Sequence, residues 1–389
     1  MKKRRIFICC QAVFPRGSAA SNYVQYFSLA LLQQNYEVFV LSDINEEYRK
    51  ELEQNDYYYK GIKIIETKMS GFKPLHYIQY HYFIDSVFSK ILSKKNIGPD
   101  DLILVYSNVS QIHRLAIEYG TKRHCKTACC MVEWFPRECY KNEIDYEKAE
   151  YNIRNIKTQH NVVFPISSYI DEFFQSQGTK TLLLPIMADT EEFQYKAKNT
   201  DKIRFIYSGN RMMKDKLIEM VKAFLQLSED DKQRIELHIC GTKEDVIDEI
   251  CNGKLKENSF IIVHKWMEYT DLVDLYQNMH YLFIAREENQ MTLANFPSKV
   301  PECMGYGIVP VVSDVGDYTK FYLTDGKDSI IFKGYNEDNC LQAIKRAIGC
   351  FDKEFKLMSA NALDTVKSRF DYRVWSLKIA ETIESLYEE

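Results

Sequence analysis

The stretch Ala294–Ser313, AlaAsnPheProSerLysValProGluCysMetGlyTyrGlyIleValProValValSer, decides the fold of this chain. It places Lys299 and Glu302 three residues apart at the start of a short helix, ends that helix with Gly-x-Gly, and continues into the apolar strand Ile308–Ser313. Helix N-termini bind phosphates, and open parallel sheets bind ligands at the carboxyl ends of their strands. The stretch therefore predicts a parallel α/β sheet with a site for a nucleotide diphosphate and its sugar.

The composition is that of an ordinary globular protein. The chain has 389 residues, 46% hydrophobic and 27% charged, which is enough for two domains and excludes a disordered or collagen-like chain. Its formal charge of −4 comes from 51 basic and 55 acidic residues, so no global charge attracts nucleic acid. We expect no nucleic-acid partner.

The first residues and the cysteines indicate a cytoplasmic protein. The basic start Met1–Arg5 is followed by an apolar run that Gln11 and Pro15 interrupt, too short for a signal peptide. No stretch reaches the ~18 apolar residues of a membrane span. The 11 cysteines are scattered without a Cys-x-x-Cys pair, which favours buried reduced thiols over disulfides or metal ligands.

Short apolar runs alternate with amphipathic helical patterns along nearly the whole chain. The runs predict strands at Ile6–Cys10, Val38–Leu41, Ile62–Glu66, Leu102–Tyr106, Thr127–Val132, Val162–Ile166, Thr181–Leu184, Ile203–Ser208, Glu236–Cys240, Phe260–Val263, Tyr281–Ala285, Ile308–Ser313 and Ser329–Phe332. The alternation is lost only over Pro185–Lys198. It predicts two tandem Rossmann-like, doubly wound parallel-sheet domains, at residues 1–190 and 191–370.

Residues 371–389 read as a final amphipathic helix. Its expected apolar residues are Trp375, Leu377, Ile379, Ile383 and Leu386. We expect this helix to dock at the domain junction or to cross back to the first domain.

The loop after the first strand, Gln11–Asn22, contains one glycine, Gly17, where a dinucleotide fingerprint requires three. This disfavours a nicotinamide-dependent oxidoreductase. Gly17 and Ser18 leave room for a ligand over a helix N-terminus, although a merely permissive loop explains them equally well.

The corresponding loop of the second domain runs from Gly209 to Leu217 and carries Arg211 and Lys214. Cations at the end of a first strand, next to a helix start, are suited to hold a diphosphate. The alternative is that both side chains point into solvent, as lysine and arginine usually do.

Three segments together resemble retaining glycosyltransferases of the two-Rossmann (GT-B) fold, in the large group called family 4. They are SerGlyAsnArgMetMetLysAsp at Ser208–Asp215, HisIleCysGly at His238–Gly241, and the block from Phe296 to Ser313. The similarity extends in order over essentially the whole chain, including the Arg16–Val40 segment.

The resemblance implies a role for each matching residue. Arg211 and Lys214 would act in catalysis by holding the donor diphosphate, Lys299 would lie near the phosphates, and Glu302 would bind the nucleotide ribose. The first glutamate of the Glu-x7-Glu signature is Ala294 in this chain. The missing sugar contacts would come from Arg286 with Asn289 and Asn295, with Gly209 at the donor loop; Glu287 and Glu288 are substitutes by proximity only.

The residue types suit departure of a nucleoside diphosphate without a metal. Fixed cations stabilise the negative charge that develops on the leaving phosphate. The chain has no Asp-x-Asp motif of the kind that holds a metal in other glycosyltransferases. We therefore expect neither a metal nor another cofactor, and the resemblance implies retention at the anomeric carbon.

The acceptor is expected on the first domain. Glu133 follows a strand at the carboxyl edge of the sheet and is a candidate to orient the acceptor hydroxyl or the donor sugar. A plain salt bridge to Arg137 is the alternative. His113 lies within a helical pattern and reads as structural. The segment Lys68–Lys95 combines aromatic residues with flanking lysines, which suits either a packed amphipathic helix or peripheral contact with the inner face of a membrane.

These features favour a cytoplasmic glycosyltransferase that moves a sugar from a nucleotide-sugar donor to a glycan or lipid-linked saccharide, in cell-surface polysaccharide biosynthesis. The alternatives are a sugar-nucleotide epimerase or phosphorylase on the same fold, or a non-catalytic sugar-nucleotide-binding member. An exported solute-binding protein is opposed by the cysteines and the lack of a signal peptide.

Overall fold

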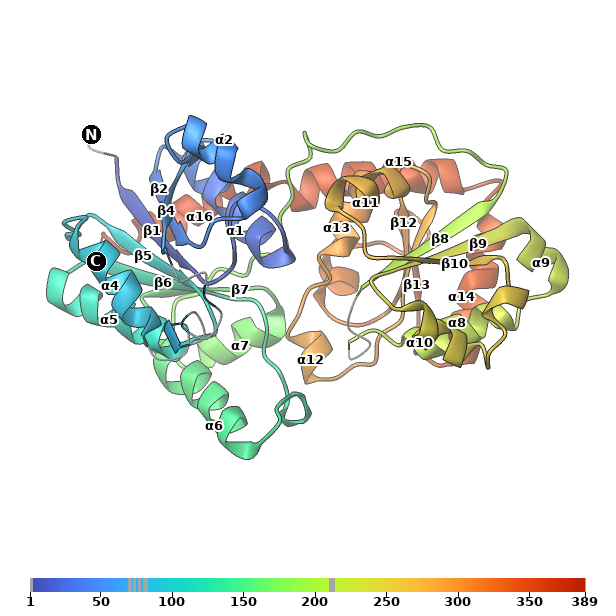
Figure 1. Cartoon of the computed structure of the whole chain (residues 1–389), viewed down its shortest axis with the longest axis horizontal. Helices are drawn as coiled ribbons and strands as arrows, with labels where there is room; N and C mark the ends of the chain where they lie inside the picture. The colour runs from blue at the N-terminus through green and yellow to red at the C-terminus, as the bar shows by residue number, and fades with distance from the viewer. Residues whose placement is uncertain are drawn as a thin grey trace. The chain divides into compact units, whose positions relative to one another are not determined.

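The computed structural model describes residues 3–68, 72, 75, 78–79, 83–209 and 214–388. The chain forms two compact α/β units. Unit 1 comprises Met1–Met187 and Tyr372–Glu389, and unit 2 comprises Ala188–Asp371. The boundaries between the units therefore lie at 187/188 and 371/372. The boundaries expected from the sequence were 190/191 and 370/371. Figure 1 shows the order of the elements in each unit.

Unit 1 is built on a seven-stranded sheet in the order β3-β4-β2-β1-β5-β6-β7. All neighbouring strands are parallel except the short antiparallel pair β3–β4. The strands are β1 (Arg5–Cys10), β2 (Glu37–Ser42), β3 (Tyr58–Tyr59), β4 (Ile62–Glu66), β5 (Leu102–Tyr106), β6 (Lys126–Met131) and β7 (Val162–Pro165).

Among the described residues, the helices of unit 1 lie between these strands in the chain, except α7 and α16, which follow β7. They are α1 (Ala19–Gln33), α2 (Arg49–Gln54), α4 (Ile84–Ser93), α5 (Ser110–Arg123), α6 (Glu143–Tyr151), α7 (Ser168–Ser176) and α16 (Tyr372–Glu384). The C-terminal helix α16 packs on α1. Glu384 of α16 accepts hydrogen bonds from the Arg4 guanidinium (3.0 Å) and the Tyr36 hydroxyl (2.5 Å). The prediction that the last helix crosses back to the first domain is thus confirmed.

Unit 2 is built on a six-stranded, fully parallel sheet in the order β10-β9-β8-β11-β12-β13. The strands are β8 (Ile203–Ser208), β9 (Ile235–Cys240), β10 (Ile261–His264), β11 (Tyr281–Ile284), β12 (Val309–Ser313) and β13 (Ile330–Phe332). Every residue of β11 and β12 is buried, as expected for strands covered on both faces. In chain order this is the 3-2-1-4-5-6 arrangement of dinucleotide-binding folds.

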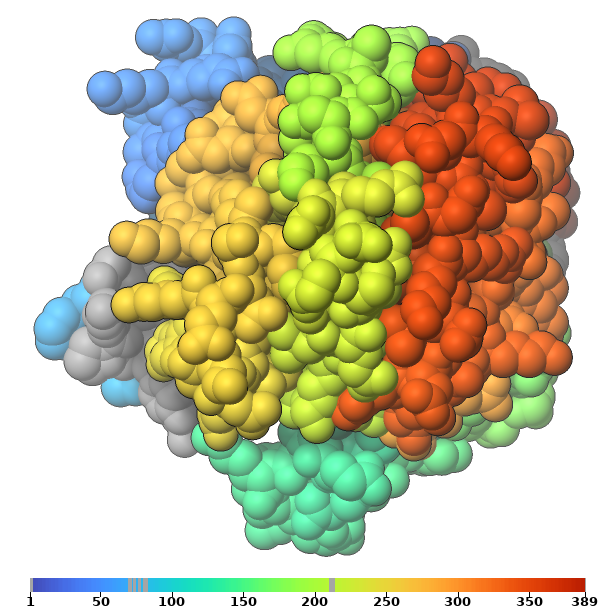
Figure 2. Space-filling view, turned by 90° about the vertical axis from the view of Figure 1, so that its right-hand side faces the viewer, coloured from blue at the N-terminus to red at the C-terminus, as the bar shows by residue number. Residues whose placement is uncertain are grey.

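The helices of unit 2 cover both faces of its sheet (Figure 1). They are α8 (Leu217–Leu225), α9 (Glu229–Arg234), α10 (Glu244–Ile250), α11 (Tyr269–Tyr276), α12 (Gln290–Leu293), α13 (Lys299–Gly305), α14 (Glu337–Cys350) and α15 (Phe355–Thr365). Figure 2 shows one face of this unit, where α14 lies beside α8. A salt bridge from Lys222 of α8 to Glu337 of α14 (3.2 Å) spans this contact, and a second, from Arg234 of α9 to Asp352 (3.4 Å), lies just beyond the end of α14.

The deciding stretch folds as its sequence predicts. Pro301 is tolerated in the first turn of α13 because the N–H that it lacks has no partner there. After the helix, Gly307 takes a φ of +68°, which side chains disfavour, and the chain turns directly into β12.

Two predictions about regular structure were wrong. Thr181–Leu184 is not a strand: Thr181 makes one isolated bridge to Val163 of β7, and the ladder stops because Pro165 has no N–H to donate. Leu377 of α16 is 57% exposed, because the buried face of this helix runs instead through Tyr372, Ser376, Ile379, Ala380 and Ile383.

Much of the segment Lys68–Lys95 lies outside the described residues, and α4 is its described helix. In the part of the chain that the structure describes, no helix combines the length and the apolar composition that crossing a bilayer requires. The 11 cysteines all lie within the described residues, and none of them forms a disulfide there.

Candidate functional site: a charged cluster at the switch point of unit 2

The strand order of unit 2 reverses between β8 and β11, which are neighbours in the sheet. In open α/β sheets such a switch point leaves a crevice outside the carboxyl ends of the strands, where ligands bind. The described residues that leave these two strands here are Gly209 and residues 214–216, after β8, and residues 286–289, after β11.

A buried carboxylate, Asp215, lies at the centre of this switch point. Its Oδ1 atom accepts a hydrogen bond from Arg286 Nε at 2.7 Å. Its Oδ2 atom accepts from Lys299 Nζ and from the Tyr207 hydroxyl, each at 3.2 Å. The side chains of Asp215 and Arg286 are 4% and 3% exposed, and that of Lys299 is 17% exposed. One carboxylate thus gathers side chains from β8, the loop after β11 and the start of α13.

The charges of this cluster stabilise one another. Burial alone would raise the pKa of Asp215, but the positive charges of Lys299 and Arg286 outweigh it and hold the pKa below its ordinary value. Burial would lower the pKa of Arg286, but the Asp215 carboxylate reverses this and raises it. Asp215 and Arg286 are therefore both charged near neutral pH, and the cluster contains two basic side chains against one acidic side chain.

Arg286 keeps hydrogen-bonding capacity beyond Asp215. Its backbone N–H donates to Ser313 Oγ at 2.7 Å, and its Nη1 atom donates to Asn295 Oδ1 at 3.3 Å. Asp215 and Asn295 engage two nitrogens of a guanidinium that carries five N–H donors.

Glu302 lies in the first turn of α13, three residues after Lys299, and is partly buried. Burial raises the pKa of Glu302 to about 7, although a hydrogen bond with Tyr269 and the charge of Lys299 act in the opposite direction. Its carboxyl group therefore titrates near neutral pH, unlike an ordinary surface glutamate.

Gly209 is a point of close approach directly after β8. A Cβ atom at this position would lie 2.7 Å from Lys299 Nζ and 2.7 Å from the Tyr207 hydroxyl. The backbone of Gly209 is held by its N–H, which donates to Cys240 O at 3.0 Å. The absence of a side chain is thus a condition for the observed position of the Lys299 ammonium group.

The structure brings together several of the residues that the sequence singled out. Arg286, Asn295, Lys299 and Gly209 share this cluster, and Glu302 lies on the same helix as Lys299. Lys214 directly precedes Asp215 and is partly buried, whereas Arg211 lies outside the described residues.

Three further residues that the sequence singled out near the cluster have other surroundings. Ala294, which occupies the position of the first signature glutamate, is fully buried at the end of α12. Glu287 is engaged in a salt bridge with Lys216 (2.7 Å) and accepts from the Tyr335 hydroxyl (3.0 Å). Asn289 caps α12 by accepting from the backbone N–H of Thr292 (3.1 Å).

The remaining candidates belong to unit 1. Ser18 is the N-cap of α1, where its hydroxyl accepts from the backbone N–H of Ser21 at 3.1 Å, and Gly17 before it has a φ of +123°. Glu133 follows β6 and is partly buried. Arg137, its suggested salt-bridge partner, pairs with Glu143.

Sequence reasoning missed Asp215 and Tyr207. The available signal was the order Lys214-Asp215-Lys216, an acid between two bases in a loop expected to bind an anion. Such an acid is compatible with an anion site only if nearby cations neutralise it, and their proximity follows from the strand order rather than from the local sequence.

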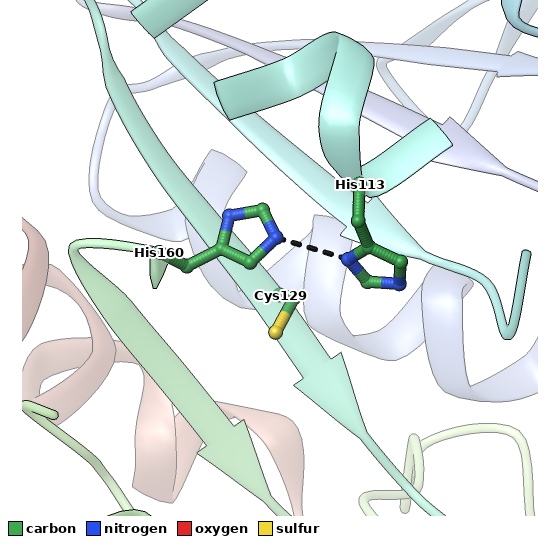
Figure 3. Close-up of side chains that lie close together, drawn as sticks. All are labelled: His113, Cys129 and His160. Atoms are coloured by element: carbon green, nitrogen blue, oxygen red, sulfur yellow. Dashed lines mark hydrogen bonds between the residues drawn. The ribbon is translucent and has the colours of Figure 1, made fainter. Parts of the chain in front are cut away.

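A second group of titratable side chains lies in unit 1: His113, Cys129 and His160 (Figure 3). All three are buried, and their ligand atoms lie within 4.8 Å of one another. His113 Nδ1 is 2.9 Å from His160 Nε2, while His113 Nε2 is 2.9 Å from Ser107 O. Burial lowers the pKa of His160 to about 3, assisted by the charge of Lys157. A chain of neutral hydrogen bonds fits this geometry, and the charged form of the Lys157 side chain would oppose a metal cation.

Comparisons with known proteins agree with this architecture. Residues 188–361 match the sequence profile of the family described as Glycosyl transferases group 1. Similar solved structures include sucrose-phosphate synthase from Thermosynechococcus elongatus, which is 12% identical with a TM-score of 0.72 over 100% of both chains. They also include a glycosyltransferase from Rickettsia africae, 13% identical with a TM-score of 0.71 over 100% of both chains.

HepE from Anabaena, solved in complex with UDP-glucose, is 13% identical with a TM-score of 0.68, covering 98% of this chain and 99% of that chain. A comparison with curated protein sequences found no match. At such low identity, the similarity of the solved structures shows the fold, and the profile match identifies the second unit. The chain is therefore a glycosyltransferase of the GT-B fold, and its second unit is a group 1 glycosyl transferase domain.

Proposed function

We propose that this protein is a retaining, metal-independent glycosyltransferase that binds its nucleotide-sugar donor at the switch point of unit 2. The observation that carries the proposal is the buried Arg286–Asp215–Lys299 cluster, a preorganised positive site at the place where parallel sheets bind ligands. Lys299, together with Arg211 and Lys214 from the preceding loop, would stabilise the charge on the leaving diphosphate. Glu302 would accept hydrogen bonds from the ribose.

The acceptor in this proposal is a glycan or a lipid-linked saccharide, bound by unit 1 with Glu133 orienting its hydroxyl group. The sugar would be added during cell-surface polysaccharide biosynthesis, in the cytoplasm or at the inner face of the membrane. Gly17 and Ser18 would leave room for the ligand above the start of α1. The mechanism uses cations of the chain in place of a metal.

The donor base is chosen first from the solved structures. HepE was solved with UDP and with UDP-glucose, so UDP-sugars are the first donors to test. The assay measures nucleoside diphosphate released from UDP-, GDP-, ADP- and dTDP-sugars in the presence of EDTA, with simple saccharides as acceptors. NMR of the product then reports the anomeric configuration.

Turnover that survives EDTA with retained configuration is the expected result. An inverted product contradicts the retaining mechanism, and activity only with added metal contradicts the metal-independent one. Donor binding without turnover toward any acceptor would favour the non-catalytic alternative, for which the buried Ala294 in place of the signature glutamate is the specific observation.

Donor binding is expected to depend on pH through Glu302. Its pKa of about 7 means that the ionised form, which accepts hydrogen bonds from ribose hydroxyls, forms only as the pH rises through neutrality. Nucleoside diphosphate affinity should therefore increase between pH 6 and pH 8. Titrations of wild type and Glu302→Gln at several pH values check this; a profile that the substitution leaves unchanged contradicts it.

The same pKa shift has a consequence for stability. The folded-state pKa of Glu302 lies above the ordinary value of 4.5, so the folded protein holds this proton more tightly than the unfolded chain. This contribution to the free energy of unfolding is present below pH 4.5 and is lost as the pH rises through 7. The free energy of unfolding of Glu302→Gln, measured over the same pH range, should lack this pH-dependent contribution.

A further inference from the structure

We propose that Asp215 is a positioning residue of the donor site, whose carboxylate holds Arg286 and Lys299 in the arrangement that a diphosphate requires. The inference rests on the proposed function and concerns a residue without a role in the family resemblance. It follows from three features of the structure: the anchoring of the Asp215 loop, the balance of charge, and the unequal exposure of the two cations.

The loop that carries Asp215 is anchored independently of the cations. The next residue, Lys216, donates its backbone N–H to Ala285 O at 2.8 Å, and its Nζ atom pairs with Glu287 at 2.7 Å. The two residues that Lys216 contacts, Ala285 and Glu287, directly precede and follow Arg286 in the sequence. The backbone contact of Lys216 thus fixes the Asp215 carboxylate beside the end of β11. The carboxylate in turn sets the positions of the Arg286 and Lys299 side chains.

A site that evolved only for high affinity toward a diphosphate would not place a carboxylate such as Asp215 beside its cations. A carboxylate at a diphosphate site lowers the positive charge available to the ligand. Its presence is explained if it keeps the buried cation Arg286 and the partly buried cation Lys299 close together, because each of them donates to a different oxygen of the same carboxylate. Without it, mutual repulsion would move the less buried cation, Lys299, away from Arg286 and toward solvent.

Asp215→Asn is therefore expected to impair catalysis, because the cation is no longer positioned, without weakening the binding of the nucleoside diphosphate, because a negative charge is removed. Loss of the fixed ammonium group should lower kcat by roughly 10- to 100-fold, as expected for a misplaced catalytic contact. The dissociation constant for the free nucleoside diphosphate should stay the same or decrease, because the site gains positive charge. Steady-state kinetics and calorimetric titration measure the two quantities. Weaker binding that accompanies the loss of kcat indicates general damage and overturns the proposal, as does an unchanged kcat.

A double-mutant cycle tests whether Asp215 acts through Lys299. In a Lys299→Met background, Asp215→Asn should lower kcat by a clearly smaller factor than in wild type. Equal factors in the two backgrounds would mean that Asp215 acts independently of Lys299, which contradicts the proposal.

Tyr207→Phe provides the same test if Asp215→Asn does not fold. It removes only the hydroxyl that donates to Asp215 Oδ2 and keeps the charges and the ring. In the wild-type background, Tyr207→Phe should lower kcat by roughly 2- to 10-fold, which corresponds to the loss of one hydrogen bond. In the Lys299→Met background, the same substitution should lower kcat by a smaller factor. The matched control is Tyr281→Phe, which removes a buried hydroxyl that donates to Ala347 O at 3.0 Å in the core. It should lower the melting temperature and leave kcat unchanged.

The outcomes separate this inference from the proposed function. A wild-type protein that neither binds nor turns over any nucleotide sugar contradicts both. Wild-type turnover, combined with an unchanged kcat in Tyr207→Phe and in Asp215→Asn, overturns the role of Asp215 alone.

Discussion

Replacing Lys299 by alanine is expected to lower turnover by roughly 10²- to 10³-fold while the protein remains folded. The ammonium group lies at the start of α13 and is held on Asp215 and over the Tyr207 ring, 4.8 Å from its centroid. It is therefore fixed before the donor binds and needs no reorganisation as charge develops on the leaving phosphate. Nucleoside diphosphate release under saturating donor measures the effect.

The fold should tolerate this change because Asp215 keeps Arg286 and Tyr207 as partners. Lys345→Ala is the matched control, since it removes the same charge from an exposed position on α14. The control should retain full activity. Equal turnover in Lys299→Ala and in the control would remove Lys299 from the mechanism.

Gly209→Ala is expected to produce the second large effect, with a single added methyl group. The Cβ atom would lie 2.7 Å from both Lys299 Nζ and the Tyr207 hydroxyl, so one or both must move. The lysine end can swing away, whereas the Tyr207 ring is buried and cannot. We expect turnover to fall by roughly 10²-fold, as for a misplaced catalytic group, and unfolding to become easier by about 1–3 kcal/mol.

Gly349→Ala is the control for this prediction. Gly349 lies in α14 of the same unit, and its Cβ would meet nothing within 4 Å. An alanine there should stabilise the helix by about 0.5–1 kcal/mol and leave turnover unchanged. Denaturant unfolding checks the expected changes in stability of the two variants, and a turnover assay checks the expected changes in activity. Full activity in Gly209→Ala would show that the position of Lys299 does not matter.

The sequence predicted the parallel sheets because their strands are continuous apolar runs separated by amphipathic helices. It failed at Thr181–Leu184, where the apolar pattern is right but Pro165 on the neighbouring strand cannot complete the ladder. Such a failure depends on which strand is adjacent, and local pattern does not contain that information.

The candidate site was predicted in part for the same reason. Lys299 and Glu302 stand out because they begin a helix in a recognisable block. Asp215 does not stand out, since its role depends on Arg286, which is 71 residues away in the chain, and on Lys299, 84 residues away. Ala294 shows the limit of the motif: the signature acid is absent, and the neighbouring Asn295 instead accepts from Arg286.

The most direct test of the donor site is a thermal-shift titration of wild type and Glu302→Ala with UDP, GDP, ADP and dTDP in EDTA. A ligand that binds only the folded state raises the melting temperature, by an amount that grows with the logarithm of the ligand concentration divided by its Kd. The proposed site predicts that one nucleotide stabilises wild type without metal and that Glu302→Ala, although folded, loses the shift. A wild type that no nucleotide stabilises, or an equal shift in the variant, would contradict a donor site at the switch point of unit 2.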